Sequence, residues 1–322
     1  MQSLERLNYI DCLKGVAIIL VVIGHLMSFS FGTNCLYEYI YIFHMPLFMF
    51  LSGYVMNEKQ NISLLKRRLT KLLVPFLIIG ISFSYYHGND IYYFITDFFK
   101  AGYWYLYCLS VFYVFFFILH KISSLFSRKS IIMKTLSILV FILFVIIQKL
   151  YNEQLGGVLS MSMLSHLWPY YISGYFIKNE MSNRNITSNG IIYGLLVIWV
   201  LFYLIIYNIY NFDHSSLVAP IIVILLYLFF KDNAKDNRIN TLLIFFGRNS
   251  LHIYVWHYFF VSSIDLHSIG YWINGSNNYI IGFCIYLFFA VIISYCCISI
   301  GKFIYQNRLL SLIIYGLNKK VD

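Results

Sequence analysis

The stretch that decides the fold runs from Asp11 to His25 and reads DCLKGVAIILVVIGH. It passes from a carboxylate and a lysine, through the wholly apolar residues 16–23, to a histidine. A membrane-spanning helix needs roughly 20 predominantly apolar residues, and this run with its continuation is long enough. An ionisable side chain deep in such a helix costs free energy and is usually functional. The stretch therefore predicts a membrane helix that carries a chemically active group.

The composition extends this prediction to the whole chain. Of the 322 residues, 60% are hydrophobic, 20% are aromatic and only 11% are charged. Ordinary soluble domains carry about 25% charged residues. With a mean hydropathy of +0.73, too few polar residues remain to cover a water-facing surface, so we expect a polytopic membrane protein.

Ten segments are apolar and long enough to predict membrane helices. They are about 13–31, 37–56, 72–87, 103–120, 131–148, 161–177, 189–209, 215–230, 242–264 and 279–304. The N-terminus is similar to a signal peptide, but no small-residue cleavage site follows, so we expect a retained first span. The connections are short, which predicts one integral membrane domain over residues 1–322 and no soluble domain.

The positive charges support this number of spans. If the N-terminus is cytoplasmic, 21 of the 23 lysines and arginines fall on the inner side, and only Lys100 and Lys149 fall outside. Cytoplasmic connections are enriched in Lys and Arg in this way. We therefore expect an all-α bundle of about ten transmembrane helices with both termini cytoplasmic, in the cytoplasmic (inner) membrane of a bacterium. The net charge of +10 then reflects topology and contact with membrane lipids, and not nucleic-acid binding.

The six cysteines predict neither disulfides nor a metal site. They lie in or beside apolar runs, and Cys296 and Cys297 are adjacent. No spacing is typical of zinc ligands or of a redox pair, so we interpret these side chains as apolar filling.

The deep titratable groups are histidines, because the carboxylates all lie away from the span centres. His25 lies eleven residues after Lys14, which is about 16 Å along a helix. His44, His252 and His257 are expected at a similar depth. A lone buried histidine is usually a hydrogen-bonded core residue, but four at one depth favour function. Neutral imidazole suits proton transfer near neutral pH.

Five segments then carry a resemblance to a known family. Lys14 and His25 have the spacing of an [Arg/Lys]-x10-His signature, and four further segments match in order: FHMPLFMFLSGYV (43–55), RRLTKLLVPF (67–76), YWYLYCLS (103–110) and FGRNSLHIYVWH (246–257). Together they resemble the acyltransferase-3 family of integral membrane acyltransferases.

The resemblance implies transfer of an acyl group, commonly acetyl from acetyl-CoA, to a hydroxyl of a sugar. The expected acceptor is a cell-surface glycan or its lipid-linked precursor, and no metal is implied. Position 14 is lysine where many members have arginine, and the chain lacks the extracytoplasmic esterase-like domain that some members carry. Both departures leave the identity of the acceptor undetermined. The second also predicts that acyl transfer is completed inside the helix bundle.

The histidine of the family's first span maps onto His25, which we interpret as the general base. An acyl-imidazole intermediate on this histidine is the alternative. The developing oxyanion needs hydrogen-bond donors in a dry site, and His44, Trp104 and Asn249 are candidates. The catalytic candidates are His25, Lys14 and His44.

The donor-binding candidates are basic, with one carboxylate among them. Lys14 and Asp11 lie one helical turn apart and could contact donor phosphates, or could be a local ion pair that anchors the helix. Arg67, Arg68 and Lys71 form the densest basic cluster. Arginine suits the phosphates of CoA, but the same cluster could anchor the chain beside anionic lipid.

The acceptor-binding candidates are Trp104, Tyr105, Asn249 and His257. Aromatic side chains can stack on a sugar ring, although aromatic belts at the membrane interface explain most such residues. Gly15 and the Ser52-Gly53 pair are expected to serve close helix packing.

Two other classes of protein compete with an acyltransferase. A glycan exporter or flippase would also have deep polar groups, but it would not require the pairing of Lys14 with His25, and the lack of deep carboxylates disfavours ion coupling. A structural scaffold would leave the deep histidines unexplained.

Overall fold

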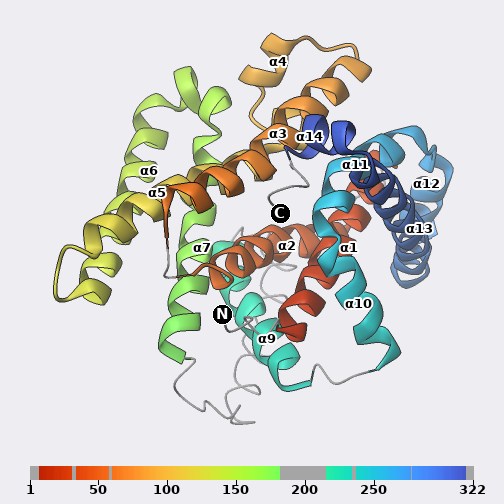
Figure 1. Ribbon diagram of the computed structural model, residues 1–322. Helices are drawn as coiled ribbons and strands as arrows, with labels where there is room; N and C mark the ends of the chain where they lie inside the picture. Colours follow the sequence, from red (N-terminus) through yellow and green to blue (C-terminus); the bar gives the residue numbers. More distant parts are fainter. Residues whose placement is uncertain are drawn as a thin grey trace. The chain divides into compact units, whose positions relative to one another are not determined.

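The computed structural model describes residues 7–30, 34–57, 60–181, 215–233, 237–276 and 278–316. All regular structure in these ranges is helical (Figure 1), which confirms the all-α class. The chain forms two compact units. The first comprises Met1–Tyr54 and Phe176–Ile298, and the second comprises Val55–Tyr175 and Ser299–Asp322.

The first unit is built around α1. Its helices are α1 (Asn8–Phe29), α2 (Cys35–Tyr54), α9 (Ser215–Asn233), α10 (Arg238–Arg248), α11 (Ser250–Ser263), α12 (His267–Ser276) and most of α13 (Tyr279–Gln306). Helix α1 contacts α2, α9, α10 and α11, and Figure 1 shows α10 and α11 beside it. Because partners lie on several sides, the uninterrupted apolar run of α1 becomes the core of this unit.

Two glycines allow α1 and α10 to approach closely. A Cβ atom at Gly15 would collide with the main-chain carbonyl of Leu243, and a Cβ atom at Gly247 would collide with that of Asp11. Small residues at a helix interface let two backbones meet in this way. The packing role expected for Gly15 is therefore observed, and it positions the polar ends of α1 and α10 against each other.

The second unit is organised around α3. It contains α3 (Ile62–Tyr86), α4 (Ile91–Thr96), the 3₁₀ turn η1 (Lys100–Gly102), α5 (Trp104–Ser123), α6 (Lys129–Leu159), α7 (Met161–Met181) as far as Tyr175, and α14 (Arg308–Tyr315). Helix α3 contacts α4, α5, η1 and α14. The side chain of Asn61 accepts a hydrogen bond from the main-chain N–H of Leu64, which caps the N-terminus of α3.

A buried lysine holds the connection between α4 and α5. The Lys100 side chain is almost fully buried. Its ammonium donates to the carbonyls of Ile95 at 2.7 Å and Asp97 at 2.8 Å, and to that of Gly157 on α6. Burial lowers the pKa of this ammonium to about 8, and the Asp97 carboxylate opposes the shift. Lys100 and Ala101 both have left-handed backbones, with φ of 50° and 49°, and the ammonium contacts hold this strained turn in place.

Six of the described helices are long and apolar enough to cross a membrane: α1, α2, α3, α5, residues Lys129–Tyr151 of α6, and α13. They coincide with the first five predicted spans and the last. Helix α3 begins at Ile62, ten residues before the predicted 72, because Asn61 caps it and its first turns are basic and not apolar. Helices α7 and α9 coincide with the predictions at 161–177 and 215–230, and the prediction at 189–209 lies outside the described residues.

The prediction of a single helix over 242–264 is wrong. The chain forms α10 and α11 instead, separated at Asn249, whose φ of −105° and ψ of 14° are not helical. The Asn249 amide donates to the carbonyl of Phe245 at 2.7 Å, and such side-chain bonds compete with the helical pattern. Apolarity shows that a segment can lie in a membrane, but it does not reveal a break of this kind.

Candidate active site

His25 lies between two tyrosine hydroxyls. Its Nδ1 is 3.2 Å from the hydroxyl of Tyr41 on α2, and its Nε2 is 2.9 Å from the hydroxyl of Tyr258 on α11. A neutral imidazole has one N–H donor and one acceptor nitrogen, whereas a phenol can do either. The ring therefore accepts from one tyrosine and donates to the other, and three helices fix its orientation.

A second imidazole lies next to His25. The ring centroids of His25 and His257 are 5.3 Å apart, and that of Tyr258 is 4.3 Å from His257. The Nδ1 of His257 is 3.1 Å from the carbonyl of Ile253 and 2.8 Å from that of Tyr254. Because a carbonyl only accepts, Nδ1 carries the proton and Nε2 is an acceptor. This Nε2 is buried and has no hydrogen-bond partner.

His44 joins the same group of rings through Tyr41. Its Nδ1 donates to the carbonyl of Ile40 at 2.6 Å, and its ring lies 4.8 Å from that of Tyr41. The side chain is 2% exposed. The structure thus brings together His25, His44 and His257, which the sequence predicts at one depth. We call these three histidines with Tyr41 and Tyr258 the imidazole cluster.

A glycine next to His25 makes room for one of the tyrosines. A Cβ atom at Gly24 would lie 2.8 Å from Cε2 of Tyr41, which is too close for a real contact. The absence of a side chain at Gly24 therefore lets the Tyr41 ring lie against α1, where its hydroxyl reaches His25.

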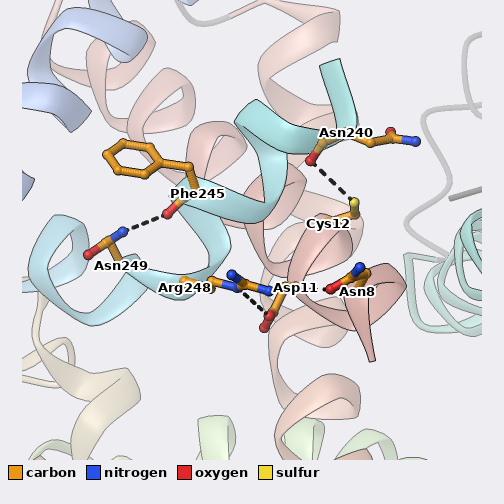
Figure 2. A network of polar contacts seen from close by, with 7 residues as sticks. All are labelled: Asn8, Asp11, Cys12, Asn240, Phe245, Arg248 and Asn249. Atoms are coloured by element: carbon orange, nitrogen blue, oxygen red, sulfur yellow. Dashed lines mark hydrogen bonds and ion pairs between the residues drawn. The ribbon is translucent and has the colours of Figure 1, made fainter. Parts of the chain in front are cut away.

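An ion pair joins the start of α1 to the end of α10. Figure 2 shows Arg248 reaching Asp11 and Asn8. The Arg248 Nε donates to Asp11 Oδ2 at 3.0 Å, and Nη2 donates to Asn8 Oδ1 at 3.3 Å. Asp11 is buried, whereas the Arg248 side chain is 43% exposed. The carboxylate predicted to act with Lys14 on the donor is thus held by Arg248, while Lys14 is half-buried one turn further along α1.

Arg248 and Asn249 belong to the segment FGRNSLHIYVWH (246–257), and both make contacts that hold helices together. Sequence reasoning missed Arg248, although its place inside that segment was an available signal. Asn249 was predicted to contact the acceptor, but its amide nitrogen is engaged with the Phe245 carbonyl (Figure 2). This part of the segment therefore joins α10 to α1 and to α11.

The basic candidates of the second unit differ from one another. The Arg68 guanidinium lies over the ring of Tyr113, 5.4 Å from its centroid, and Nη1 donates to Gln60 Oε1 at 3.1 Å. Arg67 is exposed and Lys71 is half-buried. Arg68 is thus held by neighbouring side chains, whereas Arg67 faces outward from α3.

The two aromatic candidates open α5, directly after the strained turn that Lys100 holds. Tyr105 is buried and Trp104 is half-buried, and their ring centroids are 6.4 Å apart. Both belong to the second unit.

Sequence reasoning also missed the two tyrosines that hold His25. Tyr37, Tyr41 and His44 lie four and three residues apart, so they share one face of a helix, and this spacing was a usable signal for Tyr41. Tyr258 gave no comparable signal, because a tyrosine beside a histidine carries little information in a chain that is 20% aromatic.

The described ranges contain no group of three or more His, Cys, Asp or Glu side chains placed to hold a metal ion. All six cysteines are free. The imidazole cluster supplies imidazole and phenol groups, which can bind hydroxyl groups and transfer protons.

Apolar helices surround the imidazole cluster, in which His44, His257 and Tyr258 are buried and His25 and Tyr41 are half-buried. This arrangement defines a membrane protein with a candidate proton-transfer site. The model of the acyltransferase domain of the acyltransferase-3 family matches residues 7–299, so the chain belongs to this family.

Two curated relatives match over short segments. The Nodulation protein NolL of Sinorhizobium fredii (strain NBRC 101917 / NGR234) is 46% identical over 52 residues, which are 14% of this chain and 14% of that protein. The Nodulation protein NolL of Mesorhizobium japonicum (strain LMG 29417 / CECT 9101 / MAFF 303099) is 37% identical over 78 residues, 21% of each chain. The similarity thus spans about a fifth or less of these relatives. No solved structure matches the chain.

Proposed function

We propose that this protein is a membrane-embedded O-acyltransferase. It moves an acetyl or similar short acyl group from acyl-CoA to a hydroxyl of a cell-surface glycan or its lipid-linked precursor. The observation that carries the proposal is the placement of His25 between the hydroxyls of Tyr41 and Tyr258, inside a chain of the acyltransferase-3 family.

The geometry suggests which nitrogen of His25 takes the proton. The contact with Tyr258 is 2.9 Å and that with Tyr41 is 3.2 Å, so the Tyr41 contact is the weaker one. An acceptor hydroxyl that replaces Tyr41 would meet the lone pair of Nδ1, while Nε2–H donates to Tyr258 and fixes the tautomer. The released Tyr41 O–H could then donate to the oxyanion, a role for which His44, Trp104 and Asn249 were the first candidates.

The reaction balances with these groups alone. The acceptor oxygen attacks the thioester carbonyl as its proton passes to Nδ1 of His25, which gives a tetrahedral oxyanion and an imidazolium. The oxyanion collapses, the carbon–sulfur bond breaks, and the imidazolium returns the proton to the leaving CoA thiolate. The products are the ester and free CoA. A route through acyl-His25 remains the alternative, and it would need a second group to activate the acceptor.

We propose that the donor binds through the basic residues. In the second unit, Arg67 and Lys71 are the candidates for the charged phosphates, and Arg68 would support them through its contacts with Tyr113 and Gln60. Replacing Arg67, Arg68 and Lys71 together with glutamine should weaken acyl-CoA binding more than it slows saturated turnover. Unchanged acyl-CoA affinity in a correctly inserted triple variant would show that the three residues only anchor the chain.

We propose the ten-span topology with both termini cytoplasmic, in the bacterial inner membrane. It rests on the 21 of 23 basic residues that the alternation places inside. Reporters fused after Asn61 and Asn237 should be cytoplasmic, and one fused after Asp213 should be external. An external reporter at Asn61 would overturn the assignment of the first two spans.

The deciding experiment for the function is transfer of labelled acetyl from acetyl-CoA by membranes that contain the protein, with a sugar-lipid fraction as acceptor. The expected result is label in an alkali-labile ester on the sugar. Membranes without the protein are the control. Absence of transfer with a correctly inserted protein, over a range of short acyl-CoA donors, would contradict the proposal.

A further inference from the structure

The imidazole cluster contains a hydrogen-bond acceptor that the chain leaves unused. The Nε2 of His257 is buried without a partner, and the whole side chain is 0% exposed. Buried polar groups in proteins are almost always hydrogen-bonded, and inside a membrane no bulk water is available to replace a missing partner. The observation therefore points to a ligand that supplies the missing donor.

The donor that fits is an O–H or N–H group. Nδ1 of His257 already donates to the carbonyls of Ile253 and Tyr254, which fixes the proton on that nitrogen. Nε2 consequently presents a lone pair, and only a hydrogen-bond donor satisfies it. An anion or a carbonyl at this position would be repelled.

The reacting hydroxyl cannot supply this donor, because it has one proton. In the proposed reaction that proton passes to His25, whose ring centroid lies 5.3 Å from that of His257. Two acceptor nitrogens on adjacent rings instead match two hydroxyls on adjacent carbon atoms of a sugar. One hydroxyl is acylated, and its neighbour binds His257.

We propose that His257 is a specificity-determining residue that accepts a hydrogen bond from the hydroxyl next to the one that is acylated. The inference rests on the proposed function and deepens it, because it names a vicinal diol as the acceptor class. A site built around a substrate hydroxyl rejects an analogue that lacks it, since a buried polar group is then left unpaired.

Three variants of His257 separate the roles of its two nitrogens. His257→Gln can place an amide oxygen near the position of Nε2 and so keeps an acceptor there. His257→Asn keeps a donor near the position of Nδ1, which can still bond the main-chain carbonyls, but it removes the acceptor at Nε2. His257→Phe removes both. Thermal unfolding in detergent reports whether each variant is folded.

With the sugar-lipid fraction as acceptor and saturating acetyl-CoA, His257→Asn and His257→Phe should raise the KM for the acceptor about tenfold, because the lost hydrogen bond also leaves a buried donor of the acceptor unpaired. His257→Gln should retain a KM within about threefold of the original, as expected if most of that hydrogen bond is kept. Equal KM values in the glutamine and asparagine variants would overturn the proposal. A loss of kcat with an unchanged KM would also overturn it, because His257 would then act on the proton and not on binding.

A second measurement needs no variant. trans-Cyclohexane-1,2-diol and cyclohexanol are compared as inhibitors of transfer to the sugar-lipid fraction, and the diol should inhibit at a concentration about tenfold lower. Equal inhibition by both, or inhibition by neither, would overturn the diol assignment. Failure of the proposed function looks different, since membranes with the unchanged protein would then transfer no acyl group to any acceptor.

Discussion

Lys100 in the second unit and His25 in the first unit are held by different kinds of hydrogen-bond partner. In the second unit, main-chain carbonyls receive the ammonium of Lys100, and Gln60 and the Tyr113 ring receive Arg68. In the first unit, His25 is bonded only by the hydroxyls of other side chains, and His257 leaves one nitrogen unused.

This difference separates a side chain that stabilises the fold from one that can act on a substrate. A cation enclosed by main-chain carbonyls cannot be released without breaking local structure, so it stabilises the fold. An imidazole held by tyrosine hydroxyls can exchange one partner for a substrate at little cost. Substitutions at His25 and at Lys100 should therefore affect different measurements, and the following variants test that division.

The largest effect is expected at His25. A positioned general base typically contributes 10²–10⁴-fold, so His25→Ala should lower acyl transfer by at least about 100-fold while leaving insertion and acyl-CoA binding largely intact. The ester content of the acceptor glycan and the amount of protein are measured in the same membranes. His252→Ala, on the same helix as His257, is the matched control and should have a much smaller effect. Normal ester content in the His25→Ala strain at normal expression would remove His25 from the mechanism.

At Lys100 we expect a loss of stability with little change in activity. Lys100→Met leaves the carbonyls of Ile95, Asp97 and Gly157 without their donor, which should reduce the free energy of unfolding by about 3 kcal/mol. Activity per folded molecule should change little. Lys149→Met is the control, because Lys149 is an exposed lysine of the same unit. Unfolding in a denaturing detergent measures both variants, and equal stability of the two would refute the role given to Lys100.

Close packing in the first unit should give the next largest change. Gly15→Ala pushes a methyl group into the carbonyl of Leu243, and overpacking of this kind costs about 2 kcal/mol. The matched control is Gly275→Ala on α12, where a Cβ atom meets nothing within 4 Å. The same unfolding measurement applies. If Gly15→Ala proves as stable as Gly275→Ala, α1 and α10 do not approach as closely as described.

The smallest effect is expected at Tyr258. Tyr258→Phe removes one hydrogen bond to His25 without changing the ring, and a single bond contributes about 1 kcal/mol, or roughly fivefold in rate. Steady-state transfer to the sugar-lipid fraction measures the change, and Tyr271→Phe, an exposed tyrosine of α12, serves as control. An unchanged kcat in Tyr258→Phe would mean that Tyr258 does not orient the imidazole in the working enzyme.

The sequence predicts those parts of the fold that depend on composition alone. The apolar run of α1 predicts a membrane helix, and counting residues along helices predicts a similar depth for His25, His44, His252 and His257. His25 itself is singled out by the resemblance of its pairing with Lys14 to the family's [Arg/Lys]-x10-His signature. Such features are local, or depend on a regular rise along the helix axis.

Contacts that depend on tertiary packing were not predictable. The partner of Asp11 is Arg248, 237 residues later, and no pattern in either segment indicates the other. The break at Asn249 depends on one side-chain hydrogen bond, and the burial of Lys100 depends on carbonyls of two segments. A lysine in an external connection is normally solvated, so charge counting gave no reason to bury it.

The pairing of Asp11 with Arg248 has a consequence for biosynthesis. A ribosome adds about 5–20 residues per second, so the 237 residues between the partners take roughly 10 to 50 seconds to make. During that time α1 exists without α10 and α11, while the segment Val55–Tyr175 of the other unit is produced. Helix α1 can therefore pack against α2 early, but it meets α10 and α11 only after most of the described chain has been made. The carboxylate of Asp11, which is buried in the folded structure, can form its ion pair only after Arg248 has been synthesised.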